Sequence, residues 1–242
     1  MGRLRQLRKQ LRGQPIYQRA KRLARRLTGR ELWLRPELRE PVRLSAGWLL
    51  CPERIPRGAL VFGLGVGRNI DFELGLIRNH AATVETFDPT PSSAAWLQTQ
   101  QLPPGFRHHP WAVVATDGAI QLEERKATRA GGAPMLSVVS SGRSNAGTIT
   151  AEGYRLSSVV ARLQCDVPDL LRMDIEGAEY AVLDDMLATG VLPAQLLVEF
   201  HHRFPQIGLE ATRRAIAGLR AAGYRIAAVS DTGREVTFLR AG

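Results

Sequence analysis

Three carboxylates lie within six residues in the second half of the chain, directly after an apolar run. Asp174 follows the run Leu170–Met173, and Glu176 and Glu179 come next. Acidic residues suit the start of a helix, where the backbone dipole favours negative charge, and this explains Glu176 and Glu179 without any function. It does not explain Asp174, which ends the apolar run and which we therefore expect to face a cleft. A buried carboxylate without partners is costly, so Asp174 is a candidate catalytic or binding residue.

A second apolar run ends in an acid and two histidines, Glu199, His201 and His202. Side chains alternate along a strand, so Glu199 and His201 share one face of this segment. If this strand is next to the one that ends at Asp174, the side chains of Asp174, Glu199 and His201 meet at the same end of the sheet. An imidazole with an ordinary pKa of about 6.5 suits a general base. We therefore predict catalytic roles for His201, Asp174 and Glu199 and a structural role for His202.

A glycine-rich turn lies earlier in the chain, at the end of another apolar run. Gly63, Gly65 and Gly67 let the backbone approach a ligand closely, at the point where a strand leads into a helix. The dinucleotide fingerprint places its third glycine where Arg68 stands here, so the spacing favours S-adenosylmethionine over NAD or FAD. Asp88 follows the next predicted strand, 21 residues after Gly67, where an acid accepts hydrogen bonds from a ribose diol. The alternatives are a purely structural turn and an Asp88 that caps the next helix.

The elements that position these residues alternate between strands and helices. Such an order predicts an α/β fold with a mostly parallel sheet, and the turn 231–234 predicts a closing antiparallel hairpin. A parallel sheet with this ending is typical of class I methyltransferases, which are Rossmann-like. The segment 140–147 reads as a loop that closes over a substrate or as a linker. The predicted strands are 59–64, 83–88, 111–116, 119–125, 136–139, 169–174, 195–200, 225–230 and 235–240, and the predicted helices are 69–80, one that begins near Ser92, 154–164, 177–188 and 207–222.

The composition is that of one ordinary globular domain with an appendage. The chain has 242 residues, 44% of them hydrophobic and 23% charged, and only two cysteines. This excludes a disordered chain and a disulfide framework, and we expect a cytoplasmic protein. Residues 1–30 hold 11 of the 33 Lys and Arg and no acid, so residues 31–242 are nearly neutral and the net charge of +10 arises in the extension. We predict three parts: an extension over 1–30, a connecting segment over 31–58 and the main domain over 59–242.

Residues 1–30 form a basic amphipathic pattern. Leu4, Leu7 and Leu11, and then Ile16, Leu23 and Leu27, recur at helical spacing, with arginines on the other face. One interpretation is a helix that packs its apolar strip on the domain. A second is a helix that lies on an anionic membrane surface, and a third, which we favour less, is a nucleic-acid contact.

Taken together, four segments resemble the FkbM-type methyltransferases over about residues 59–240. The resemblance implies a class I fold, S-adenosylmethionine as cofactor, and O-methylation of a hydroxyl on a small molecule or sugar. It implies that Gly63, Gly65, Gly67 and Asp88 bind the cofactor and that Asp174 lies between cofactor and substrate, with Asp117 as a weaker match to the acid on the adenine side. The segments are Phe62-Gly-Leu-Gly-Val-Gly67, Phe87-Asp-Pro-Thr-Pro91, Leu171-Arg-Met-Asp-Ile-Glu-Gly-Ala-Glu-Tyr180 and Val198-Glu-Phe-His-His202.

Two departures from the family pattern leave the amino end of the methionine moiety without an assigned partner. Val61 stands where many class I enzymes have an acid, and Arg68-Asn69 replaces an expected acidic pair. Asp174 could bind that amino group, and the role of general base would then fall to His201 or Glu199. We predict no metal, with Mg²⁺ on Asp174 and Glu199 as the alternative. The other functional alternatives are a nucleic-acid methyltransferase and a non-catalytic module that docks on membrane or RNA.

Overall fold

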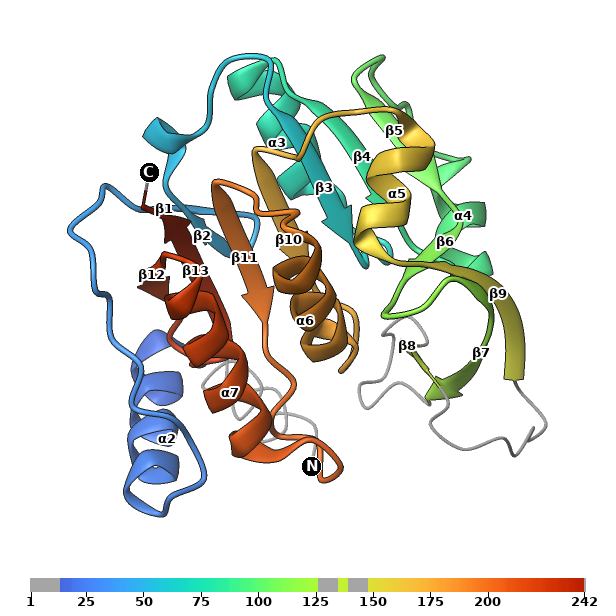
Figure 1. Ribbon diagram of the computed structural model, residues 1–242. Helices are drawn as coiled ribbons and strands as arrows, with labels where there is room; N and C mark the ends of the chain where they lie inside the picture. Colours follow the sequence, from blue (N-terminus) through green and yellow to red (C-terminus); the bar gives the residue numbers. More distant parts are fainter. Residues whose placement is uncertain (1–13, 126–134, 139–147, 242) are drawn as a thin grey trace, which may run out of the picture.

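The computed structural model describes residues 14–125, 135–138 and 148–241. Its centre is a seven-stranded sheet in which only β13 runs antiparallel to its neighbours (Figure 1). The fold is therefore α/β with a mostly parallel sheet that ends in an antiparallel hairpin, as predicted. In spatial order the strands are β12 (Tyr224–Val229), β13 (Glu235–Arg240), β11 (Gln195–Glu199), β10 (Leu170–Met173), β3 (Leu60–Leu64), β4 (Thr83–Phe87) and β5 (Phe106–His109).

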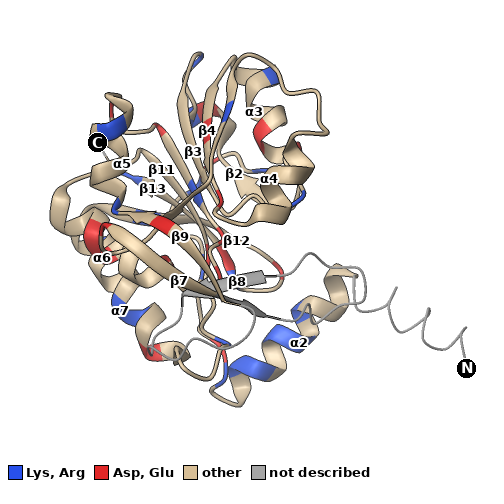
Figure 2. Ribbon diagram, turned by 90° about the vertical axis from the view of Figure 1, so that its right-hand side faces the viewer, with Lys and Arg blue, Asp and Glu red and all other residues tan. Residues whose placement is uncertain are grey.

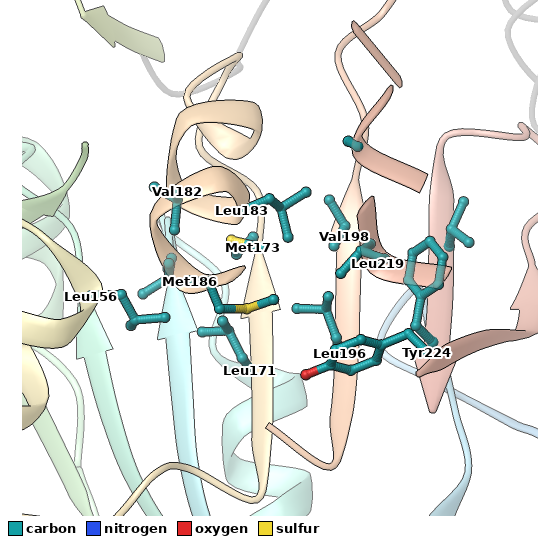
Figure 3. Close-up of a cluster of buried hydrophobic side chains, with 14 of the residues drawn as sticks. Leu156, Leu171, Met173, Val182, Leu183, Met186, Leu196, Val198, Leu219 and Tyr224 are labelled. Atoms are coloured by element: carbon teal, nitrogen blue, oxygen red, sulfur yellow. The ribbon is translucent and has the colours of Figure 1, made fainter. Parts of the chain in front are cut away.

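Helices cover both faces of this sheet (Figure 1). The helices α5 (Leu156–Leu163), α6 (Glu179–Thr189) and α7 (Gly208–Ala221) lie on one face, and their apolar sides meet those of β10 and β11 in the largest core cluster (Figure 3). On the other face α3 (Asp71–His80) packs with β2 (Trp48–Leu50). Strands that are buried on both faces must be apolar throughout, which explains the uninterrupted runs in the sequence.

A second sheet of four strands lies beside the first. Its order is β6 (Trp111–Val113), β9 (Thr148–Tyr154), β7 (Gly118–Arg125) and β8 (Met135–Val138). The strand predicted over 111–116 is therefore present as β6, but it lies in this second sheet, and the third strand of the main sheet along the chain is β5. The residues of β5, Phe-Arg-His-His, are mostly polar, as an edge strand permits, and this polarity concealed the strand. The strand β9 was also missed, and α5 begins at Leu156 rather than near 154.

The region before the main domain is built from short elements. The helix α2 spans Pro15–Leu27, with proline at its first turn, where no backbone donor is needed. A hairpin of β1 (Arg43–Ser45) and β2 packs on the sheet, and a turn of 3₁₀ helix follows at Pro52–Arg54. The remaining helix, α4 (Pro91–Leu97), also begins with proline. The predicted loop 140–147 and the first three leucines of the extension lie outside the described residues.

Candidate active site

The glycine turn after β3 lies against the end of β10, where the chain order of the parallel strands reverses. Gly65 has φ +76°, and a Cβ there would lie 1.9 Å from the carbonyl oxygen of Asp174. The backbone amide of Asp174 donates to the carbonyl of Leu64 at 3.0 Å. Only glycine fits this contact, which places Asp174 directly beside the turn. Ligands of open α/β sheets bind at this reversal, beyond the carboxyl ends of the strands.

Asp88 lies at the end of β4 and is only 5% exposed. One carboxylate oxygen accepts from the backbone amide of Gly67 at 2.8 Å, and the other accepts from that of Thr90 at 2.8 Å. A carboxylate offers about four acceptor positions, so two backbone donors leave room for ligand hydroxyls. A Cβ added to Gly67 would meet no described atom within 4 Å, so this side of the turn is open. The turn and Asp88 therefore fit a nucleoside.

Asp117 lies elsewhere, after β6 in the second sheet. Its two oxygens accept from the backbone amide of Arg155 at 2.7 Å and from the hydroxyl of Ser158 at 2.6 Å. These contacts hold the start of α5. The structure therefore shows hydrogen bonds that join Asp117 to the start of α5. Its adenine-side role stays a prediction.

His201 lies at the centre of the acidic group and is 4% exposed. Its Nε2 atom is 3.8 Å from a carboxylate oxygen of Asp174, 3.5 Å from one of Glu176 and 3.9 Å from one of Glu199. The structure thus brings together Asp174, Glu199 and His201, because β10 and β11 are parallel neighbours whose carboxyl ends meet. Their catalytic roles stay predictions.

Glu179 is the acid that organises this group, and the sequence interpretation missed it. Its side chain is fully buried, and Nδ1 of His201 lies 2.8 Å from Oε1. The same carboxylate accepts from the backbone amides of Ile175 and Gly177, each at 3.0 Å. The interpretation of Glu179 as a solvated helix-start residue is therefore wrong, since its side chain folds back into the preceding loop. In that loop Glu176 has a φ of +52°, which few residues other than glycine adopt.

The surroundings shift the pKa values of these groups upward. Burial lowers the pKa of His201, but the hydrogen bond with Glu179 and the nearby carboxylates outweigh it and raise the pKa to about 9. Burial, together with the charge of Asp174, raises the pKa of Glu199 to about 8. Burial also raises the pKa of Asp174, and the neighbouring His201 opposes this only in part. His201 is therefore an imidazolium at neutral pH in the free protein.

Two arginines that the sequence analysis did not select support the site. Arg172, in the middle of β10, is 5% exposed; its Nε lies 3.0 Å from a Glu73 oxygen, and it donates to the carbonyl of Gly65 at 3.2 Å. Arg172 thus stabilises the glycine turn through its hydrogen bond to Gly65. Arg234, in the turn of the closing hairpin, pairs with Glu199. A charged residue inside an apolar run was the available signal for Arg172.

His202 contacts the N-terminal region. Its Nε2 lies 2.7 Å from an oxygen of Glu31, and Arg203 pairs with the same carboxylate. Burial opposes ionisation of Glu31, but these partners lower its pKa to about 2. The buried contact between His202 and Glu31 agrees with the predicted structural role of His202.

One group of donor atoms could hold a metal ion. Single atoms of Asp174, Glu176 and His201 all lie within 4.8 Å of one another. Hard cations such as Mg²⁺ take carboxylate oxygens, so this chemistry is available, with Glu176 rather than Glu199 as the second acid. The metal-free site stays a prediction.

The fold is Rossmann-like, with a glycine turn and an acid at the ends of β3 and β4, beside polar groups at the ends of β10 and β11. Residues 64–226 match the family model described as "Methyltransferase FkbM domain". The chain belongs to this family of methyltransferases, which confirms the resemblance inferred from the sequence. No curated protein matches the chain significantly.

A solved structure was also found to be similar. It is the crystal structure of the methyltransferase FkbM from Methylobacillus flagellatus KT, with 12% sequence identity and a TM-score of 0.49. The match covers 76% of this chain and 44% of that chain, so this chain spans less than half the length of that protein.

Proposed function

We propose that this protein transfers a methyl group from S-adenosylmethionine to a hydroxyl oxygen of a small molecule or sugar. The observation that carries the proposal is the convergence of Asp174, Glu199 and His201 beside Gly65. The site therefore combines a glycine turn and Asp88, which suit a nucleoside, with side chains that can take up a proton. Family membership supports methyl transfer, and the FkbM resemblance supports the hydroxyl acceptor.

The residues at the strand ends would hold the cofactor in a defined orientation. Gly63, Gly65 and Gly67 would let it lie close to the backbone, and Asp88 would accept hydrogen bonds from the ribose diol. Asp174, beside Gly65, would face the positively charged end of the cofactor. The chemistry supplied by the bound cofactor is a methyl group on a sulfonium, which is transferred by in-line displacement. The protein contributes mainly by positioning the acceptor oxygen at about 3 Å on the reaction axis.

An alcohol is a poor nucleophile until its proton leaves, so a base is required. We assign this role to His201 through Nε2, because Nδ1 is engaged by Glu179. The assignment requires that the imidazolium first lose its proton. A positively charged cofactor beside Asp174 would favour this loss, because like charges lower the pKa of a cationic group. Glu199 and Asp174 would orient the acceptor or the imidazole.

Binding of the cofactor can be tested by titration calorimetry with S-adenosylmethionine and its demethylated product. The substitution D88N is expected to weaken binding roughly 10- to 100-fold, because it removes a charged acceptor. The matched control D71N changes an exposed acid near the same turn and is expected to leave affinity unchanged. Thermal unfolding of both variants checks that each is folded. Absence of heat and of any thermal shift for the wild-type protein would overturn the cofactor assignment.

The acceptor can be sought with labelled S-adenosylmethionine and a panel of glycans, hydroxylated metabolites, RNA and DNA. We expect label in a hydroxyl-bearing small molecule or sugar, and the same yield with EDTA as with added Mg²⁺. Label in nucleic acid alone would establish the other methyltransferase alternative. Cofactor binding without transfer to any acceptor would favour the non-catalytic module, and loss of transfer in EDTA would favour the metal-assisted variant.

A further inference from the structure

The helix α2 is attached to the domain through its arginines. Arg22 donates to the carbonyl of Ser230 at 2.8 Å, and Arg26 donates to those of Leu32 and Leu34, each at 2.9 Å. Arg19 pairs with Asp231 at 2.6 Å. A surface helix of a globular domain ordinarily does the reverse and buries its apolar stripe.

The apolar side of α2 consequently faces away from the domain. Ile16 is 78% exposed, Leu23 is 49% exposed and Leu27 is 73% exposed. Their spacing of seven and four residues places them on one side of the helix. We call these three residues the outer strip. Within the described residues, the interpretation that α2 packs its apolar strip on the domain is therefore wrong.

Two aromatic residues of α2 and of the segment after it are also exposed. Trp33 is 54% exposed, and the guanidinium carbon of Arg26 lies 5.0 Å from the centre of its ring. Tyr17, in the first turn of α2, is 40% exposed. Exposed Trp and Tyr side chains suit the boundary between water and lipid headgroups, because each combines an apolar ring with a polar group.

The charge around the outer strip is positive. Residues 1–30 contain 11 basic and no acidic residues, and the Lys and Arg of α2 are distributed along its length (Figure 2). Lys21 and Arg30 are exposed. An anionic surface with an apolar layer beneath it complements both features. No helix of the described residues is long and apolar enough to cross a bilayer, so the geometry required is that of a helix lying in the interface.

We propose that the outer strip, with Trp33, docks this protein on an anionic lipid surface. Nucleic acid fits less well, because it offers no apolar layer in which the exposed Ile16, Leu23 and Leu27 side chains could be buried. Docking would also bring one end of the main sheet close to the lipid. Figure 1 shows α2 at the end of the sheet where β10 and β11 terminate, and Glu31 links the segment after α2 to His202.

The proposal is tested by co-sedimentation of the full chain with phosphatidylcholine vesicles, with and without phosphatidylglycerol. We expect binding only when the anionic lipid is present, and weaker binding as salt is raised. The triple variant I16S/L23S/L27S is expected to bind at least tenfold more weakly, because it removes the apolar side chains that would be buried in the lipid. Because the three positions are exposed, the variant is expected to keep its fold. The matched control L44S alters another exposed leucine, on β1, and is expected to bind like the wild type.

Trp33 provides a second readout. Its emission is expected to shift to the blue when anionic vesicles are added, and the shift is expected to be absent in W33F. Equal pelleting of the triple variant and the wild type would overturn the proposal. So would three other results: loss of binding on removal of residues 1–13 while the triple variant still binds, RNA binding that depends on the outer strip without vesicle binding, and self-association through the strip without vesicle binding.

Discussion

At the scale of single residues, the main finding is an imidazole enclosed by four acids. A lone histidine with an ordinary pKa would be largely neutral at pH 7. In this protein Glu179 holds Nδ1 of His201 at 2.8 Å, and the pKa rises to about 9. The group that we assign as the base is therefore mostly in its inactive, protonated form at neutral pH. A raised pKa at a buried cluster is common at functional sites, where surroundings adapt a group to its task.

The pH dependence of turnover tests this assignment. The fraction of neutral His201 rises about tenfold for each pH unit below its pKa, so kcat/KM is expected to increase from pH 7 to pH 9 and then level. The variant E179Q removes the charge that raises the pKa of His201 and is expected to move the rise to lower pH. The control E210Q alters an exposed acid on α7 and is expected to leave the profile in place. A kcat/KM that is flat or falling over this range would exclude His201 as the base.

At the scale of elements, two acids hold the connections that lead into α5 and α6. The turn between β10 and α6 is held by Glu179, which accepts from the backbone amides of Ile175 and Gly177 in the loop before the helix. The start of α5 is held by Asp117, through Arg155 and Ser158. The acid expected on the surface, Glu179, thus shapes the candidate site, and Asp117 contacts the start of a helix while its adenine-side role stays a prediction.

The capping role of Asp117 leads to a prediction about stability and binding. The substitution D117A is expected to lower the free energy of unfolding by about 1 kcal/mol, as for loss of a helix cap, and to leave affinity for S-adenosylmethionine within twofold. Urea unfolding and titration calorimetry measure the two quantities. The control D184A changes an exposed acid on α6 that is expected to affect neither. A tenfold loss of affinity without loss of stability would instead support the adenine-side assignment.

At the scale of the whole molecule, Glu31 joins the N-terminal region to the end of β11. Its carboxylate is 1% exposed and pairs with His202 and Arg203. Because the pKa of Glu31 is about 2 in the folded protein, below the ordinary value of 4.5, the carboxylate stabilises the fold above pH 4.5. This contribution is lost as the pH falls towards 2.

The variant E31Q measures this connection. At pH 7 it is expected to lower the free energy of unfolding by about 2 kcal/mol, because hydrogen bonds to a charged group are replaced by weaker ones. The difference from the wild type is expected to shrink as the pH falls from 4.5 towards 2. Urea unfolding at several pH values measures this difference. The control E210Q breaks an exposed ion pair on α7 and is expected to change the free energy of unfolding by less than about 0.5 kcal/mol. A difference that does not vary with pH would contradict the ionic role.

Features that depend on near neighbours along the chain were determined by the sequence alone. The alternation of strands and helices, the turn at Gly65 and the placing of Asp88, Asp174 and His201 at strand ends follow from apolar runs and backbone preferences. Which strands are neighbours was decided by tertiary structure, because pairing joins residues far apart in the chain. For this reason the strand predicted over 111–116 joined the second sheet as β6, and β5 became the edge strand of the main sheet. Burial of Glu179 and the outward face of α2 also depended on the folded surroundings, since the cost of a charge or an apolar side chain is set by what encloses it.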